Sequence, residues 1–165
     1  VIVTAGLTQV STRFASLLDL STGTNFIRIR VWESTLEILQ DNPVMGLGLD
    51  QFLSVFSGAY VRPDAIFDPD LSHPHNIILD FWIRLGLLGV GWLLMLVWLV
   101  GQYVSRMTSH FQVARDGYAV YVGTVGALVA GFAHGMIDNS IYVIDLAFIF
   151  VFLVAILTVK YTEEA

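Results

Sequence analysis

Charge is what this sequence has least of for its length. Only 13% of its 165 residues are Asp, Glu, Lys or Arg, against about 25% in an ordinary globular domain. The sequence has no cysteine, which excludes disulfides and thiolate metal sites. Basic residues are few, the net charge is −6 and no basic stripe is present, which argues against nucleic acid as a partner.

Apolar residues make up 56% of the chain and give a mean hydropathy of +0.72. Residues 85–105 carry no charge, the only titratable charge-bearing side chain in 117–137 is His134, and the only charged residue in 139–159 is Asp145. A helix needs about 20 apolar residues to cross a bilayer, and buried soluble helices rarely reach this length three times in succession. The sequence therefore predicts an all-α, polytopic membrane protein with about three transmembrane helices, near residues 76–103, 117–133 and 141–159.

The remaining segments are assigned around these helices. The apolar residues 1–10 lack a starting Met and a basic region, so we expect the end of a truncated membrane segment and not a signal peptide. Residues 11–76 are predicted to form a large helical extracytoplasmic loop, 77–160 the three transmembrane helices and 161–165 a cytoplasmic tail.

Within the loop, apolar residues at near-helical spacing predict an amphipathic helix over 26–40. A second short helix is expected over 50–60, and three prolines predict irregular structure over 61–74. The two glycines Gly46 and Gly48 predict a tight turn or a close approach of another backbone.

Basic residues set the orientation. Arg106, Arg115 and Lys160 fall on one side of the three-span arrangement, which the positive-inside rule makes cytoplasmic. The arginines of the large loop do not contradict this orientation, because long loops are translocated largely regardless of charge. The loop and the polar turn 134–140 are therefore expected at the outer face.

His75 is the strongest candidate for chemistry. It follows a proline at the mouth of the first predicted span, and a histidine can act as a base near neutral pH. The competing interpretation, a solvated or helix-capping histidine, is the more frequent one when only the residue type is considered. His73 could join His75 at a metal, but no third ligand at a typical spacing is obvious, so we expect no metal site.

Three arginines are candidates for binding an anionic substrate, because a guanidinium makes paired bonds with phosphate. Arg28 and Arg30 lie on the predicted amphipathic helix, where Arg30 could instead pair with Glu33 and Arg28 could be solvated. Arg84 lies about two turns into the first predicted span, where charge is rare and usually functional. Its alternative is an internal pair with Asp80.

Three motifs, in order, resemble the O-antigen ligase and O-antigen polymerase superfamily. An Arg-x3-Trp, Pro-x2-Gly-x-Gly and Phe block runs from Arg28 to Phe52. The string His75-Asn76, nine residues, then Gly86-x-x-Gly89 resembles the family's second motif, and residues 134–138, His-Gly-Met-Ile-Asp, resemble its penultimate-helix ending. Together they span roughly residues 24–145. Val90 stands where ligases often carry Ser or Thr, which weakens the ligase subtype without affecting the superfamily.

The resemblance implies a metal-independent, inverting glycosyltransferase of lipopolysaccharide biosynthesis, without a cofactor, in the bacterial plasma membrane. The donor would be a glycan on undecaprenyl diphosphate, and the acceptor a hydroxyl of lipid A core, another glycan repeat or a protein. His75 would be the catalytic base or would position the acceptor, and Arg28 would hold the diphosphate, with Arg30, Asn76 and Arg84 as further substrate-binding residues. We expect the isolated chain to be inactive.

Two other functions stay open at this point. A transporter or channel fragment would use Arg84, Asp138 and Asp145 as an intramembrane polar pathway. A membrane-anchored binding domain would need the outer loop without any catalysis.

Overall fold

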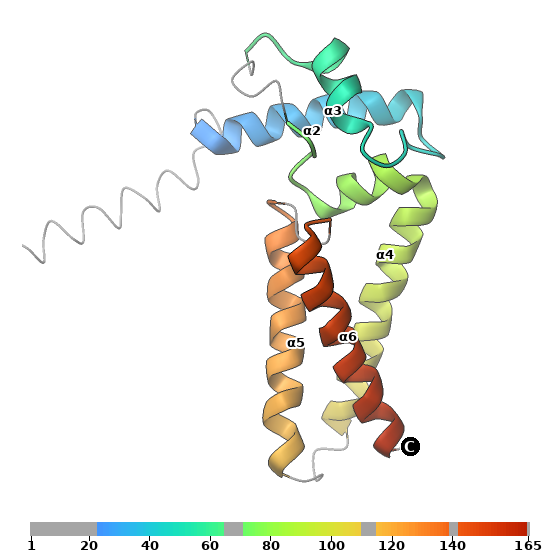
Figure 1. Cartoon of the computed structure of the whole chain (residues 1–165), viewed down its shortest axis with the longest axis vertical. Coiled ribbons are helices and arrows are strands. Elements are labelled where there is room, and N and C mark those ends of the chain that lie inside the picture. Colours follow the sequence, from blue (N-terminus) through green and yellow to red (C-terminus); the bar gives the residue numbers. More distant parts are fainter. Residues whose placement is uncertain (1–22, 65–70, 110–114, 139–141, 165) are drawn as a thin grey trace, which may run out of the picture.

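The computed structural model describes residues 23–64, 71–109, 115–138 and 142–164. All regular structure in these ranges is helical, which confirms the predicted class. The elements are α2 (Gly23–Asp41), α3 (Phe52–Val55), the π-helical turn η1 (Phe56–Tyr60), α4 (Ile77–Ser109), α5 (Arg115–Gly135) and α6 (Ile144–Glu164). Figure 1 shows that α5, α6 and most of α4 run side by side as a bundle, while α2, α3 and η1 lie across one end of it.

The predicted helices correspond to observed ones. The amphipathic helix expected over 26–40 is α2, and the short helix expected over 50–60 is the α3–η1 pair. The second and third apolar helices are α5 and α6. Because α6 continues to Glu164, it includes most of the predicted tail. The membrane segment expected in residues 1–10 lies outside the described residues.

One helix among the described residues is long and apolar enough to cross a membrane, the segment Ile77–Ser105 of α4. The apolar parts of α5 and α6, Ala119–Gly135 and Ile144–Thr158, are shorter, so the count of three spans stays a prediction. Large apolar side chains lie exposed along the bundle, for example Leu88 at 84% and Phe148 at 73%. Such a surface suits lipid or further helices better than water.

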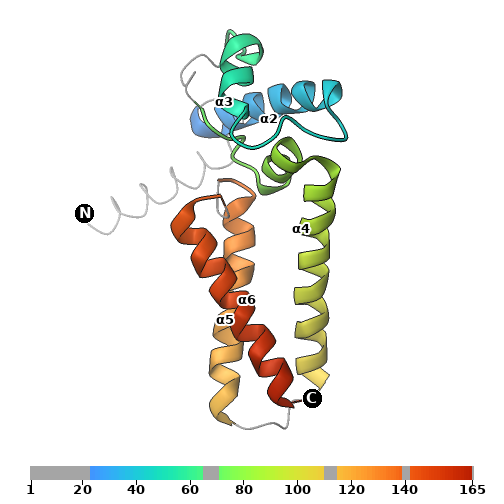
Figure 2. The ribbon, with the colours of Figure 1, turned by 45° about the vertical axis from the view of Figure 1, so that its right-hand side comes forward.

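The helix α4 is not continuous, which corrects the expectation of one straight helix over 76–103. Gly86 has φ 67° and ψ −158°, a conformation essentially restricted to glycine. The ribbon changes direction at this point: residues 77–85 lie beneath α2, and the rest of α4 runs along the bundle (Figures 1 and 2).

The break arises because the 43–48 loop replaces hydrogen bonds of the helix. The Leu87 N–H donates to the Val44 carbonyl (2.9 Å), and the Ile83 carbonyl, four residues before Leu87, accepts from the Leu47 N–H (2.7 Å). The Trp82 indole N–H also donates to the Pro43 carbonyl (2.7 Å). Two segments about 40 residues apart therefore satisfy each other's backbone groups at the break, as buried backbone groups require.

The glycines of both motifs make room for this contact. A Cβ on Gly46 would lie 2.5 Å from the carbonyl oxygens of Trp82 and Ile83, which confirms the predicted close backbone approach. A Cβ on Gly86 would overlap the Val44 carbonyl oxygen, and one on Gly89 would lie 2.5 Å from the Phe81 carbonyl oxygen. Gly86 and Gly89 therefore both accommodate the break.

An apolar core packs α2, α3 and η1 against the first part of α4. It consists of Val31, Ile38, Leu39, Phe52, Phe56, Leu71 and Ile83. Burying apolar side chains contributes about 1.5–3 kcal/mol each, so this cluster holds α2 and α3 against the segment that leads into the bundle.

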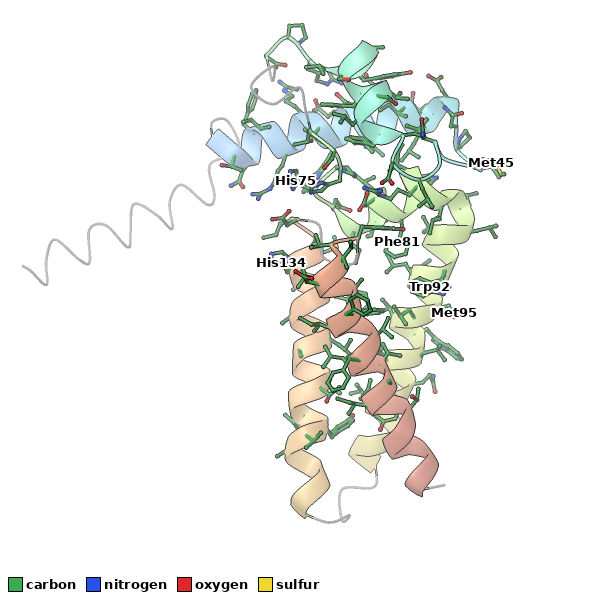
Figure 3. All side chains as sticks on the ribbon, in the orientation of Figure 1. Met45, His75, Phe81, Trp92, Met95 and His134 are labelled. Carbon is green, nitrogen blue, oxygen red and sulfur yellow. The ribbon has the colours of Figure 1, made fainter. Side chains whose placement is uncertain are left out.

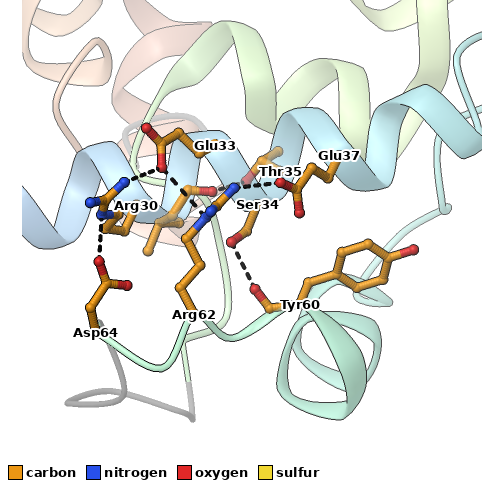
Figure 4. A network of polar contacts seen from close by, with 9 residues as sticks. Arg30, Glu33, Ser34, Thr35, Glu37, Tyr60, Arg62 and Asp64 are labelled. Carbon is orange, nitrogen blue, oxygen red and sulfur yellow. Dashed lines mark hydrogen bonds and ion pairs between the residues drawn. The ribbon is translucent and has the colours of Figure 1, made fainter.

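A polar network, drawn in Figure 4, ties α2 to the chain after η1. Arg30 pairs with Glu33 (2.8 Å) and with Asp64 (3.0 Å). Arg62 pairs with Glu37 and lies 3.4 Å from the Glu33 carboxylate. The network is part-exposed, so it orients these segments more than it stabilises them.

Candidate active site

His75 lies in the turn before α4, at the end of the bundle that faces α2 (Figure 3). Its φ of 50° is one of two positive values at non-glycine residues in the described chain. Its Nδ1 atom lies 2.9 Å from the Asp138 Oδ1 atom, across 63 positions of sequence. An ionised carboxylate only accepts hydrogen bonds, so the donor in this contact is Nδ1, and Nε2 is the ring nitrogen that this contact does not use.

His73 packs beside this pair. The two imidazole rings meet edge to face with centroids 4.3 Å apart, and His73 Nε2 lies 3.7 Å from the same Asp138 oxygen. The Ser72 hydroxyl lies 3.0 Å from His73 Nδ1. Burial, together with the neighbouring His75, lowers the pKa of His73. The lowered pKa favours the neutral form of His73.

His73, His75 and Asp138 each offer a metal-ligand atom, and these atoms lie within 4.8 Å of one another. Two imidazoles and one carboxylate form a ligand set that zinc accepts. The sequence shows no third metal ligand at a typical spacing from the two histidines. In the structure Asp138 provides one, from a turn more than 60 residues further along the chain. The expectation that the protein works without a metal stays a prediction.

Asn76 builds the frame of the site. Its side-chain oxygen accepts from the N–H groups of Ile78 (3.0 Å) and Leu79 (3.2 Å), which is the N-cap arrangement of a helix start. Its amide nitrogen donates to the Met136 carbonyl (3.2 Å) in the turn that carries Asp138. Asn76 thus fixes both ends of the His75–Asp138 contact, while its predicted role in substrate binding stays a prediction.

The helix α2 reaches the histidine turn through Trp32, whose indole N–H donates to the Pro74 carbonyl (2.9 Å). Arg28 is one helical turn before Trp32, on the same face, and is half-buried. Its Nε atom is buried and has no hydrogen-bond partner among the described residues. No hydrogen bond or ion pair joins Arg28 to His75 in that part of the chain. Arg30, by contrast, is occupied by Glu33 and Asp64.

Arg84 is the most heavily engaged of the predicted residues. Its Nε donates to Asp80 and its Nη1 to Asp50, both at 2.7 Å, and its guanidinium lies 4.6 Å from the centre of the Tyr142 ring. The predicted Asp80–Arg84 pair is therefore confirmed. Arg84 precedes the break at Gly86, in the part of α4 next to α2, and its placement within a membrane span stays a prediction.

The three residues that would form an intramembrane polar pathway in a transporter are not spread along the bundle. Arg84 lies before the break in α4, Asp138 follows α5, and Asp145 begins α6. All three positions are therefore at the end of the bundle next to α2 (Figure 1). A transport pathway would need polar groups along the length of the bundle, so this arrangement favours a site at one membrane face.

Sequence reasoning proposed His75, Arg28, Arg30, Asn76 and Arg84 as site residues, but it did not pair His75 with Asp138. The His-Gly-Met-Ile-Asp string of residues 134–138 contains this aspartate, but the string indicates a family resemblance and not a contact with His75. Asp50 was missed entirely, because an isolated acid in a loop has no spacing that marks it.

Comparison with known families matches residues 1–94 to a family described as O-antigen ligase. The match covers more than half of the 165 residues and includes Arg28, the 43–48 loop, His75 and the break at Gly86. It ends before α5, so Asp138 lies beyond it. No curated protein and no solved structure matches the chain.

Proposed function

The chain belongs to the O-antigen ligase family, and from this we propose that it transfers a glycan from undecaprenyl diphosphate to an acceptor hydroxyl. The acceptor is on lipid A core, on another glycan repeat or on a protein. The reaction takes place at the outer face of the bacterial plasma membrane, with α2, α3 and the histidine turn on that side. Family membership supports glycosyl transfer, and the positions of the basic residues support the orientation.

The observation that carries the mechanism is the contact between His75 and Asp138. His75 Nε2 takes the proton of the acceptor hydroxyl while that oxygen forms a bond to the anomeric carbon. The bond from this carbon to the diphosphate oxygen breaks, and the diphosphate leaves with the electron pair. A single displacement of this kind inverts the anomeric configuration. Asp138 holds the imidazole in the required tautomer and stabilises its charge once it is protonated.

Arg28 is the cation assigned to the departing diphosphate. It shares a helix face with Trp32, which contacts the residue before His75, and its Nε is buried without a protein partner among the described residues. An arginine that is not neutralised internally is available for paired bonds to phosphate oxygens. Arg30 and Arg84, which face carboxylates, are less suited to that role.

The reaction is proposed to need no metal. A lipid diphosphate is already a good leaving group, so positioning and charge stabilisation by the protein suffice. His75 and Asp138 hydrogen-bond each other directly, with Nδ1 and Oδ1 2.9 Å apart, and need no ion to be held together. Transfer by the full-length enzyme should therefore persist in excess EDTA.

The test is complementation in a strain that lacks the full-length enzyme. His75→Ala and Arg28→Ala should each abolish or strongly reduce surface glycan at normal protein levels, since base assistance alone is worth on the order of 10²–10⁴ in rate. The matched controls are His134→Ala and Arg62→Ala, because these residues lie outside the cluster of His73, His75 and Asp138. Normal glycan in both test variants would refute the catalytic assignment. If His75→Ala loses transfer but still binds donor and acceptor, the protein is an enzyme and not a binding domain.

A further inference from the structure

A second polar site lies beside the histidines. A hollow of about 490 Å³ opens at the end of the bundle, where the loop after the 43–48 segment meets the turn between α5 and α6. Its volume is in the range of small-molecule sites. It is lined by Leu49, Asp50, Leu53, Ser72, Arg84 and Tyr142. Four of these six side chains are polar or aromatic with a polar tip, and they come from four separate segments of the chain.

Asp50 is the unusual member of this lining. Its φ is 57°, a left-handed backbone conformation that is uncommon for residues other than glycine. One carboxylate oxygen accepts from Arg84, yet the side chain as a whole is 89% exposed. Strained conformations of this kind cluster at functional sites. The only other non-glycine residue with positive φ in the described chain is His75.

The charges of the hollow argue against a phosphate. The Arg84 guanidinium already binds both Asp80 and Asp50, so its charge is paired, and Asp50 is the carboxylate that lines the hollow. This carboxylate would repel a diphosphate, whereas neutral hydroxyl groups can donate to carboxylate oxygens and accept from a hydroxyl or guanidinium. Hydrogen bonds to charged groups are the stronger ones. This lining therefore suits a polyhydroxyl ligand.

Ser72 connects the hollow to the catalytic histidine. Its hydroxyl contacts His73 (3.0 Å), and the His73 ring packs on the His75 ring. Ser72 also lines the hollow, so a ligand bound there is separated from His75 by only two side chains. Arg28, assigned to the donor diphosphate, is on α2 and does not line the hollow.

We propose that this hollow is the subsite for the acceptor saccharide, with the carboxylate of Asp50 as the residue that binds its hydroxyl groups. The inference rests on the proposed glycosyl transfer, and it adds where the acceptor binds and which residue recognises it. Ser72 and Tyr142 complete the lining, while Arg84 holds the Asp50 carboxylate in place.

The test measures saccharide binding separately from catalysis. Full-length protein in lipid nanodiscs is titrated with methyl glucopyranoside, methyl galactopyranoside and methyl mannopyranoside, and binding is followed by saturation-transfer NMR. At least one of the three should bind, and Asp50→Asn should weaken it on the order of tenfold or more, since a charged hydrogen bond is lost. Asparagine tolerates positive φ, so this variant keeps the backbone conformation. Ser72→Ala is the second test variant.

The matched control is Asp41→Asn, which changes an exposed acid that contacts Tyr60 outside the hollow and should leave binding unchanged. His75→Ala should also bind saccharide normally, so the subsite can be confirmed even if the proposed catalysis fails. In transfer assays, Asp50→Asn should raise the acceptor KM and leave the donor KM unchanged. Absence of pyranoside binding, equal binding in Asp50→Asn and wild type, or an effect confined to the donor KM would each overturn the proposal.

Discussion

Replacing Gly86 by alanine tests the break in α4. At an ordinary position inside a helix, Gly→Ala stabilises the protein by about 0.5–1 kcal/mol. Gly86 is not such a position, because its φ of 67° and ψ of −158° belong to a region that residues with a Cβ avoid. The added Cβ would also overlap the Val44 carbonyl oxygen and lie 2.7 Å from the Met45 carbonyl carbon.

The expected cost follows from these contacts. Forcing alanine into this conformation costs about 1–3 kcal/mol. If the 43–48 loop instead moves away, the protein loses the hydrogen bonds Leu87–Val44 and Leu47–Ile83, each worth about 0.5–1.5 kcal/mol. Either route gives a loss of roughly 1–3 kcal/mol, opposite in sign to the effect at an ordinary helical glycine.

The assay is thermal unfolding of the full-length protein in detergent, with Gly91→Ala as the matched control. Gly91 is in the same helix, and nothing lies within 4 Å of a Cβ built on it. Gly86→Ala should lower the melting temperature by about 2 °C or more, and Gly91→Ala should leave it unchanged or raise it. Equal melting temperatures for the two variants would show that α4 is straight at Gly86.

Three further predictions concern the site. Asp138→Asn should lower the transfer rate on the order of 10²-fold in a kinetic assay, because the His75 tautomer is no longer fixed; an unchanged rate would exclude the pair. Asn76→Ala should lower stability by about 1 kcal/mol through loss of the helix cap, measured by thermal unfolding, whereas Asn76→Asp should retain most of it. The lowered pKa of His73 means that the unfolded chain binds a proton more readily than the folded one, so stability falls as pH drops through the unfolded value of 6.5. His73→Phe should reduce this acid-induced fall in melting temperature, and an identical fall would contradict the assignment.

The sequence predicted the helices well because their signals are local. Apolar runs and helical spacing identified α2, α5, α6 and most of α4, and two closely spaced glycines indicated the close approach at Gly46. The break at Gly86 was not predictable in the same way. Its cause is a hydrogen-bond exchange with a loop about 40 residues earlier, and the apolar pattern continues through it without interruption.

The same distinction between local contacts and contacts distant in sequence applies to the candidate site. The Asp80–Arg84 pair was predictable because residues four apart on a helix are neighbours. The Asp138 partner of His75 and the Asp50 partner of Arg84 were not, since each contact joins segments that are distant in sequence. The break also places Arg84 in the short part of α4 next to α2, where its guanidinium meets the carboxylates of Asp80 and Asp50.

The turn between α5 and α6 has a role that the family match alone does not indicate. The match ends at residue 94, yet Asp138 reaches back to His75, and Tyr142 lies against Arg84 and lines the hollow. Both proposed binding regions are therefore completed by residues that follow the matched segment. Asn76 fixes this turn through the Met136 carbonyl, so the start of α4 and the end of α5 are positioned together. The turn between the last two helices thus supplies the Asp138 carboxylate and the Tyr142 ring, in addition to connecting two apolar helices.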